Sequence, residues 1–165
     1  QAINLDVGPT NAEAVFGLSG ADTIDGTTAN WDLALYGRSN GDTLIGGSAN
    51  DRLFGDAGAD ALDGGLGNDY LRGGLELSGG TEADHFVFND RWGNDRVFDF
   101  ADNGLEKIDL SGVAGIDEIG DLTITDGVGY ARIAYVDTVS AAWSASIRVD
   151  GVTAAELGTD DFIFV

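Results

Sequence analysis

An uninterrupted nine-residue period over residues 37–72 constrains the fold of this chain more than any other feature of its sequence. Four consecutive units read GRSNGDTLI, GGSANDRLF, GDAGADALD and GGLGNDYLR. Glycine opens each unit, aspartate fills its sixth place and leucine fills its eighth. A period of this regularity predicts a solenoid in which each unit is one structural repeat that contacts its neighbours.

Each unit divides into a turn and a short strand. Places one to six are polar and rich in glycine, which lets the backbone turn sharply and adopt positive φ values. Places seven to nine form a strand whose one apolar side chain, at place eight, is directed inward. So short a strand is not stable alone, and it requires copies stacked above and below it.

The units resemble the nonapeptides of RTX (repeats-in-toxin) β-roll modules of secreted bacterial proteins, whose pattern is G-G-x-G-x-D-x-U-x. The resemblance implies that two units make one coil, so that sixth-place carboxylates of alternate units stack about 4.8 Å apart. Carboxylates at that separation repel each other unless a cation lies between them. Carboxylates and turn carbonyls are the oxygen ligands that Ca²⁺ takes. The alternative is a solvated acidic array without metal, but consecutive in-register units rarely arise by accident.

The unit before this run is irregular. Residues 26–36 form an eleven-residue unit, with Asp32 as its acid. Because the extra residues disturb the register, either Ala34 or Leu35 points inward. Trp31 is either a packing residue over this bulge or a ligand-binding aromatic.

The repeat spacing extends further in both directions. Residues 8–16 read as a degenerate unit with Glu13 at place six, and a six-residue insertion after Gly74 still leaves Asp84 at place six. Stacking of alternate units then predicts two rows of acids. One row contains Asp22, Asp42, Asp60 and Asp84, and the other contains Glu13, Asp32, Asp51 and Asp69. The turn residues expected to complete the metal sites are Gly47, Ala49, Gly58, Gly65 and Gly67. Neighbouring acids in a row share an ion, which predicts about four to six calcium ions.

The charge balance disfavours several classes of partner. Twenty-nine acids against eight bases give a formal net charge of -21, which argues against nucleic acid, anionic membranes and polyanionic polysaccharides. The chain contains no cysteine, so it has no disulfide, no cysteine-based catalysis and no cysteine zinc site. No apolar run reaches the roughly 18 residues of a membrane helix, so membrane insertion is not expected.

Residues 85–165 follow a different pattern, in which β-branched and aromatic residues alternate with polar ones. This alternation predicts a largely antiparallel region with turns at residues 126–127 and 150–151. A short helix is expected at residues 153–157, where Glu156 follows a threonine cap.

The predicted fold class is therefore all-β. Residues 1–88 are expected to form a calcium-binding parallel β-roll of RTX repeats, and residues 89–165 a C-terminal, largely antiparallel β cap. The chain ends on Asp161 and four apolar residues, 162–165, which resemble an uncleaved type I secretion signal. The other reading is a final core strand, and both can be true at different times.

One segment of the cap resembles the C-terminal domains of serralysin-type proteins. DRVFDF and, after a short loop, EKIDLS match D-x-I-x-D-F-x-x-G-x-D-x-I-D-L-S, with one extra residue and with Glu in place of Asp. The resemblance implies that Asp95 and Glu106 hold a further calcium ion. Asp99 and Asp109 read either as members of that motif or as turn and strand-end acids.

The sequence lacks a catalytic constellation. His85 is its only histidine, so no two-histidine H-E-x-x-H helix exists, and no G-x-S-x-G elbow accompanies it. His85 is therefore read as a surface or cap-packing residue. A small self-contained hydrolase would require a deep pocket around it.

These features predict a non-catalytic calcium-binding module that folds outside the cell and serves the secretion and stability of a larger exported protein. The resemblance implies a type I ABC exporter as partner and a catalytic domain, such as a metalloprotease, upstream. The alternative is a carbohydrate-binding or adhesin module with a polysaccharide partner. Its aromatic platform would contain Trp92, Trp143, Tyr130 and Tyr135, and its bases would be Arg91, Arg96, Lys107, Arg132 and Arg148.

Overall fold

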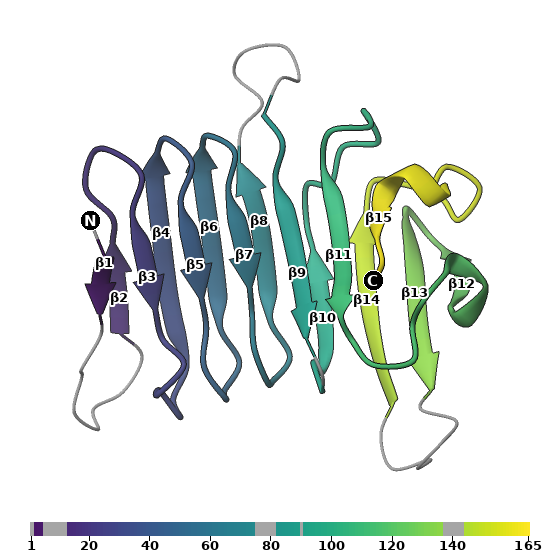
Figure 1. The fold of residues 1–165 in the computed structure, drawn as a ribbon, viewed down its shortest axis with the longest axis horizontal. Helices are drawn as coiled ribbons and strands as arrows, with labels where there is room; N and C mark the ends of the chain where they lie inside the picture. Colours follow the sequence, from purple (N-terminus) through teal and green to yellow (C-terminus); the bar gives the residue numbers. More distant parts are fainter. Residues whose placement is uncertain (1, 5–12, 75–81, 90, 137–143) are drawn as a thin grey trace.

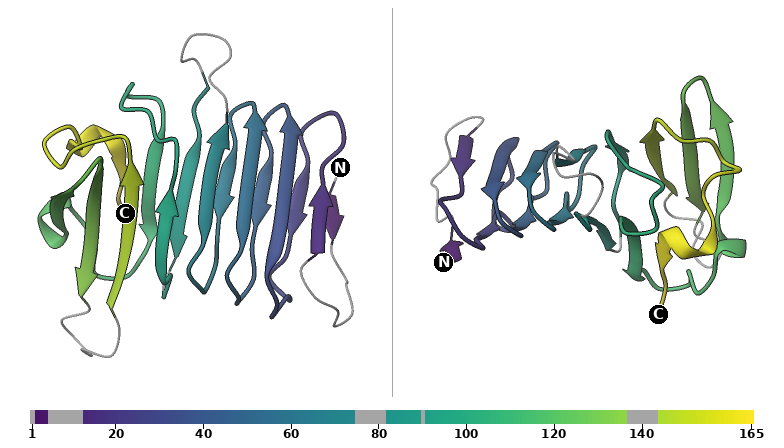
Figure 2. Two further views of the ribbon diagram at one scale, coloured as in Figure 1. Left: turned by 180° about the vertical axis from the view of Figure 1, so that it is seen from behind. Right: turned by 90° about the horizontal axis from the view of Figure 1, so that it is seen from above.

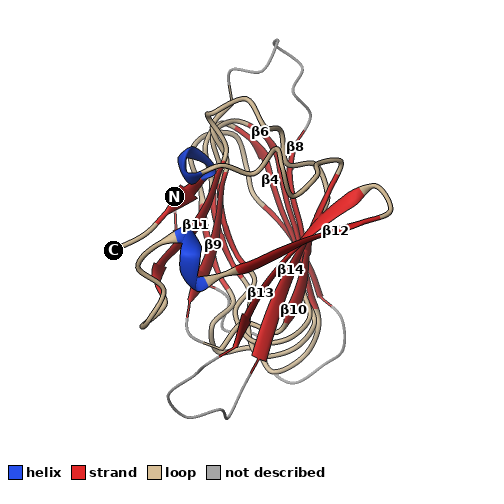
Figure 3. Cartoon of the chain, turned by 90° about the vertical axis from the view of Figure 1, so that its right-hand side faces the viewer, coloured by secondary structure: helices blue, strands red, loops and turns tan. Residues whose placement is uncertain are grey.

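The computed structural model describes residues 2–4, 13–74, 82–89, 91–136 and 144–165, with side chains from residue 14 onward. Two sheets face each other along the molecule, and the chain passes from one to the other in successive coils (Figures 1 and 2). In a view along the coils the two sheets enclose the space between them (Figure 3). This arrangement is the predicted parallel β-roll.

The seven-stranded sheet is parallel throughout. Its strands are, in spatial order, β1 (Ala2–Asn4), β3 (Thr23–Asp25), β5 (Thr43–Ile45), β7 (Ala61–Asp63), β9 (His85–Asn89), β11 (Lys107–Gly112) and β15 (Phe162–Ile163). Every second strand of the chain therefore adds to this sheet until β11, and the last strand closes it.

The eight-stranded sheet is parallel over most of its width and antiparallel at its C-terminal end. Its parallel strands are β2 (Glu13–Phe16), β4 (Leu33–Ser39), β6 (Arg52–Ala57), β8 (Tyr70–Gly74), β10 (Asn94–Val97) and β14 (Ser144–Asp150). The antiparallel strands β13 (Tyr130–Val136) and β12 (Thr123–Gly127) follow β14 in space. The predicted fold class, a parallel roll with antiparallel C-terminal strands, is confirmed.

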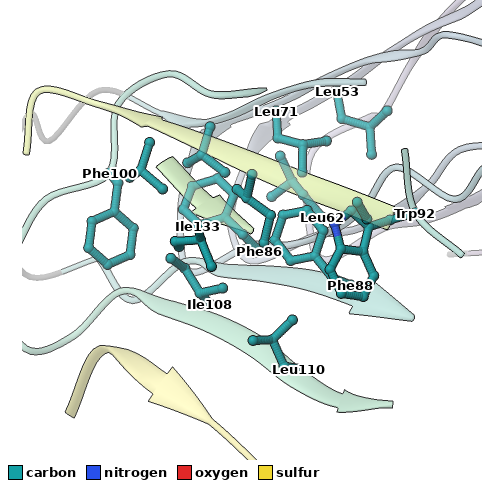
Figure 4. Packing of buried hydrophobic residues seen from close by; sticks show 14 of the residues in the cluster. Leu53, Leu62, Leu71, Phe86, Phe88, Trp92, Phe100, Ile108, Leu110 and Ile133 are labelled. Atoms are coloured by element: carbon teal, nitrogen blue, oxygen red, sulfur yellow. The ribbon is translucent and has the colours of Figure 1, made fainter. Parts of the chain in front are cut away.

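The core is a stack of place-eight side chains from both sheets. In the seven-stranded sheet they are Ile24, Leu44, Leu62, Phe86 and Ile108, and in the other sheet Leu35, Leu53, Leu71, Val97 and Val149. All ten are 0 % exposed, and Figure 4 shows part of this packing. Each three-residue strand is stable because the coils on both sides cover its one apolar side chain.

Parallel stacking extends past residue 88, further than the sequence analysis placed it. β9, β10 and β11 continue the two parallel sheets, and β14 stacks on β10 with Asp95 opposite Ile147. Among the described strands, antiparallel pairing is limited to β12, β13 and β14. Side-chain alternation has the same period in parallel and antiparallel strands, so it could not separate the two arrangements.

The cap differs locally from the prediction. The turn between β12 and β13 lies at Val128 and Gly129, where Gly129 has φ +77°, whereas Asp126 and Gly127 still belong to β12. The second predicted turn is present, with Gly151 directly after β14 at φ +86°.

The predicted short helix is a single hydrogen-bonded turn. Glu156 N–H donates to the Thr153 carbonyl at 3.1 Å, and Thr153 N–H donates to Glu156 Oε2 at 2.7 Å. The short 3₁₀ helices of the described cap are η1 (Ile119–Asp121) and η2 (Thr159–Asp161). Among the described residues, no helix is long and apolar enough to cross a membrane.

Candidate metal centre

One edge of the roll carries a row of aspartates, each of which stands immediately before a strand of the seven-stranded sheet. The N–H of Asp22 donates to Asp42 Oδ1 at 2.7 Å, that of Asp42 to Asp60 Oδ1 at 2.7 Å, and that of Asp60 to Asp84 Oδ1 at 2.8 Å. The insertion before Asp84 does not break the row, because Ala61 still pairs with His85. The predicted register of this row is confirmed.

A second row lies before the strands of the eight-stranded sheet. Asp51 N–H donates to Asp69 Oδ1 at 2.7 Å, and Asp69 N–H donates to Asp95 Oδ1 at 2.8 Å. Asp95 is thus the next member of this row. Glu106 instead extends the first row, since Lys107 pairs with His85 and so places Glu106 opposite Asp84. The two acids that the serralysin resemblance assigned to one further ion therefore lie in different rows.

Asp32 does not occupy the second row, contrary to the prediction. Leu33 takes that place: its N–H donates to Asp51 Oδ1 at 2.7 Å, and its side chain is buried. Asp32 is exposed, and its Oδ1 accepts the N–H of Asn50 at 3.2 Å. The eleven-residue unit therefore shifts the register by one place. Leu35 is the inward residue of that unit, because it pairs with Leu53.

The carboxylates of both rows are buried, and three of them are incompletely hydrogen-bonded. Asp22, Asp42, Asp51, Asp60, Asp69, Asp84, Asp95 and Glu106 are each at most 4 % exposed. Asp42, Asp60 and Asp69 each have a buried Oδ2 without a hydrogen-bond partner. An unpartnered buried carboxylate oxygen is energetically costly, so these atoms are suited to a cation ligand.

The turns leave no room for side chains between these carboxylates and the next coil. A Cβ atom at Gly37 would lie 2.5 Å from Asp42 Oδ2 and 2.7 Å from the carbonyl oxygen of Gly55. Glycine at place one therefore lets the carboxylate face its own turn and the turn of the following coil. Oxygen atoms gathered in this way match the ligand set of Ca²⁺.

Backbone carbonyls line the edge of the second row. The carbonyl of Gly47 faces Gly65 of the next coil and accepts the N–H of Leu66 at 3.0 Å. The carbonyl of Ala49 faces Gly67. Gly58 lies at the edge of the first row, where it packs against the backbone of Asn40. The five turn residues predicted as ligands thus lie between coils, at the edges that carry the acids. No group of three or more acidic, histidine or cysteine side chains converges among the described residues, so a cation there would rely on carbonyls or water for its other ligands.

Burial, and in part repulsion between neighbouring acids, raises the pKa of five of the row acids. Burial, with contributions from neighbouring acids, raises the pKa of Asp60 to about 7 and that of Asp69 to about 8. Burial also raises the pKa of Asp95 to about 7, and it raises the pKa values of Asp42 and Asp51. Without a cation, the fold therefore favours the protonated form of these five carboxyl groups more than the unfolded chain does.

Asp99 and Asp109 behave as turn and strand acids. Asp99 accepts the N–H groups of Gly73 and Gly74 at 3.0 and 3.1 Å and pairs with Arg72. Asp109 Oδ1 accepts the N–H of Ser111 at 2.9 Å. Both carboxylates therefore have ordinary hydrogen-bond partners outside the two rows.

A ladder of place-five side chains runs beside the second row, and the sequence analysis missed it. Asn68 N–H donates to Asn50 Oδ1 and Asn94 N–H donates to Asn68 Oδ1, each at 2.8 Å, and Ser146 Oγ donates to Asn94 Oδ1 at 2.9 Å. The recurring Asn-Asp pairs at residues 50–51 and 68–69 were the available signal. The ladder satisfies turn N–H groups beside the acids of this row.

The histidine and the four aromatic residues proposed for other activities do not come together in one site among the described residues. His85 begins β9 and is half-buried. Trp92 and Tyr135 are buried, 4 % and 7 % exposed, so they do not form an aromatic platform. Tyr130 is half-buried, with the Arg148 guanidinium 4.0 Å from its ring centroid. Trp143 lies outside the described residues.

Two in-register rows of buried carboxylates, with unpartnered oxygens and turn carbonyls between the coils, define a calcium-binding parallel β-roll. The family model of the RTX calcium-binding nonapeptide repeat matches residues 11–30 and 36–71 in four copies. The chain therefore carries RTX calcium-binding nonapeptide repeats. A search of curated proteins finds no match.

Two solved structures share the fold. The AlgE6R3 subunit of the Azotobacter vinelandii mannuronan C5-epimerase is 24 % identical with a TM-score of 0.59, over 97 % of this chain and 82 % of that one. The AlgE6R2 subunit of the same enzyme is 23 % identical with a TM-score of 0.54, over 83 % of this chain and 95 % of that one.

Proposed function

We propose that this chain is a non-catalytic module whose folding depends on calcium, part of a larger exported protein. The observation that carries the proposal is the buried, unpartnered Oδ2 of Asp42, Asp60 and Asp69 within rows of stacked acids. When bound, calcium supplies the positive charge that these carboxylates lack, and its binding is coupled to folding.

The residues themselves provide the coupling. Oδ1 of Asp60 accepts the N–H of Asp42, one coil earlier, at 2.7 Å. This bond fixes the carboxylate and leaves Oδ2 to bind a cation, so the ligand geometry exists only when adjacent coils are stacked. An unfolded chain has the same acids without this register, and it therefore binds calcium more weakly than the folded roll.

Circular dichroism of the full chain tests this function. In chelator, we expect loss of the β signal, and millimolar Ca²⁺ should restore it. Mg²⁺ should substitute poorly, because it requires a tighter octahedral shell. The matched control is Asp117→Asn, an exposed acid outside both rows. A spectrum unchanged by chelator, with no metal found by elemental analysis, would contradict the proposal.

The proposal extends to export. RTX repeats recur in secreted bacterial proteins, which supports an extracellular location and passage through a type I ABC exporter. Low cytosolic calcium would leave the chain unfolded and able to pass through the exporter. Extracellular calcium would then fold it, with dissociation constants of about 10⁻⁴–10⁻³ M. Any catalytic domain of the exported protein would lie outside this chain.

A second candidate function, carbohydrate binding, is favoured by the outer face of the eight-stranded sheet. Its arginine–aromatic face is defined by Arg52, Arg72, Arg96, Arg132 and Arg148 together with Phe16, Tyr36, Phe54, Tyr70, Phe98 and Tyr130. Five of the eight basic residues of the chain thus share one face, one from each of β6, β8, β10, β13 and β14. The net charge of -21 is therefore a poor guide to this face.

The rings of this face are stacked along the roll. The Phe16 and Tyr36 centroids are 4.8 Å apart, and the Tyr36 and Phe54 centroids are also 4.8 Å apart. The Arg96 guanidinium lies 5.1 Å from the Phe98 centroid. Aromatic planes and guanidinium groups can stack on sugars and pair with carboxylates. A linear acidic polysaccharide laid across the strands matches this chemistry, and the similarity in fold to a mannuronan epimerase subunit supports mannuronan as the first probe.

Binding of mannuronan oligomers, measured by calorimetry in saturating calcium, tests the second candidate. We expect Arg52→Gln, a substitution at an exposed arginine of this face, to weaken binding several-fold, and added salt should weaken it further. Arg91→Gln is the matched control, because Arg91 is exposed in a turn outside this face. Equal binding of a neutral glucan, or no binding at all, would count against this function.

A further inference from the structure

Three arginines stand side by side at the C-terminal end of the arginine–aromatic face. Arg96 of β10 pairs with Arg148 of β14, and Arg148 pairs with Arg132 of β13. These strands are neighbours in the eight-stranded sheet (Figure 3). Adjacent strands lie about 4.8 Å apart, so the three side chains begin within about 10 Å of one another. Like charges directly opposite each other in a sheet are destabilising, so this cluster costs stability unless opposite charge compensates it.

One acid within the cluster compensates only part of its charge. Asp150 is 9 % exposed. Its Oδ2 accepts the Nε–H of Arg96 at 2.5 Å, and its Oδ1 accepts the Nε–H of Arg148 at 2.6 Å. The acid that closely follows β10, Asp99, pairs with Arg72 instead. The other side chains on this face of the three strands carry no charge, namely Asn94, Tyr130, Ala134, Val136, Ser144 and Ser146. Three arginines against one aspartate leave two positive charges, on a chain whose formal net charge is -21.

The three guanidinium groups are held in place and are accessible to solvent. In addition to the bonds to Asp150, the Arg148 guanidinium lies 4.0 Å from the ring centroid of Tyr130. Arg132 donates to Ser146 Oγ at 3.3 Å. The side chains of Arg96 and Arg148 are 40 % and 43 % exposed, and Arg132 is exposed. Each guanidinium carries five N–H donors, more than these contacts use, so donors remain for a ligand.

A phosphate monoester matches the charge and the donors of this cluster. At neutral pH it carries about 1.5 to 2 negative charges and presents three acceptor oxygens, and arginine binds phosphate in bidentate fashion. A uronate carboxylate carries one charge, so it would leave part of the cluster uncompensated. Tyr70 pairs with Arg96 on the other side of the cluster and is half-buried. Its ring offers a plane on which a sugar can pack.

We propose that Arg96, Arg132 and Arg148 bind the phosphate group of a phosphorylated sugar, whose ring packs beside Tyr70. Asp150 positions two of the guanidinium groups and does not contact the ligand. The arginines come from three separate segments of the chain, so the site exists only when β14 is stacked on β10. The inference rests on the second candidate function and deepens it, because it names the charged group that this end of the arginine–aromatic face takes.

Calorimetry with glucose 6-phosphate, on the full chain in saturating calcium, tests the inference. We expect it to bind about ten-fold more tightly than glucuronate, which carries a single charge, and Arg132→Gln to weaken it about ten-fold, the loss typical of one charged hydrogen bond. Arg91→Gln, at an exposed arginine outside this face, is the matched control and should bind as the wild type does. No binding, or equal binding of glucuronate, would overturn the inference. Equally tight binding of inorganic sulfate would overturn the assignment to a sugar phosphate.

A second measurement requires no variant. In NMR spectra of the wild type, we expect glucose 6-phosphate to shift the Nε–Hε resonances of Arg96, Arg132 and Arg148 together and to leave that of Arg91 unchanged. Shifts confined to other arginines would overturn the inference. Binding of glucose 6-phosphate without binding of mannuronan would support this site and remove mannuronan as the ligand, whereas the reverse would overturn this inference alone. Circular dichroism in chelator tests the calcium function separately.

Discussion

The backbone N–H of Leu33 donates to Oδ1 of Asp51 at 2.7 Å, so an apolar side chain occupies a place in the second row where a carboxylate would otherwise stand. The backbone of the row continues there, since Leu33 N–H makes the same bond that Asp51 N–H makes to Asp69. What is missing is the oxygen ligand. The second row therefore lacks a carboxylate pair at this coil, which reduces the number of shared ions along it.

Restoring the acid should restore the site. We expect Leu33→Asp to bind one more calcium ion than the wild type, counted by native mass spectrometry. In chelator the variant should be less stable, by at least the ~2–5 kcal/mol of a buried leucine truncation. Asp32→Asn is the matched control: Asp32 is exposed, so its ion count should equal that of the wild type. Loss of an ion in Asp32→Asn would show that the shifted register is wrong.

Substitution of an acid in the middle of a row should weaken calcium binding more than substitution of an acid nearer the end of the row. Asp60 stands between Asp42 and Asp84 in the first row. We expect Asp60→Asn to weaken the binding of two calcium ions and Asp22→Asn to weaken the binding of fewer. Calcium titration by calorimetry measures the difference. Asparagine keeps the acceptor for the N–H of the preceding coil, so the comparison isolates the lost charge. Equal stoichiometry and midpoints in the two variants would argue against ions shared along the row.

The nonapeptide period, together with its resemblance to RTX modules, predicted the roll, the first row and the place-eight core, because each unit specifies its own turn and strand. The shift at Asp32 was not predictable, since an eleven-residue unit can place its extra residues before or after the acid. Pairing of β14 with β10 was missed for another reason: it joins residues far apart in the sequence, and alternation does not identify a partner strand. The arginine–aromatic face is also invisible until the coils are stacked.

The metal-free protein should respond to pH in the opposite sense from most proteins. The folded-state pKa values of Asp60 and Asp69 are raised, mainly by burial, to about 7 and about 8, above an unfolded value of about 3.9. Their protonation therefore favours the fold fully below about pH 4, and this contribution is lost as pH rises through about 7–8. In chelator, we expect β structure to increase as pH falls from about 9 to about 5, measured by circular dichroism.

Calcium binding should show the reverse trend. The row carboxylates bind a cation only when deprotonated, so calcium affinity should fall as pH falls through the same range. Calorimetric titrations at several pH values, with proton release measured in buffers of different ionisation enthalpy, check this. Affinity that does not change with pH, without proton release, would contradict the raised pKa values.

Changes in the last strand can distinguish a role of residues 162–165 in core packing from a role in export. Phe162 is 7 % exposed and pairs with Ile108, whereas Val165 is 86 % exposed. We expect Phe162→Ala to destabilise the calcium-loaded roll by about 3–5 kcal/mol, measured by denaturant unfolding. Deletion of Phe164 and Val165 should cost less, because Phe164 is only half-buried.

If an exporter reads the end of the chain, the same short deletion should block secretion of a fusion protein while calcium titration stays close to that of the wild type. Phe162→Ala, which keeps the chain end, should still be exported, because export acts on the unfolded chain. Normal secretion of the deleted fusion would remove the signal hypothesis and leave residues 162–165 with a packing role alone.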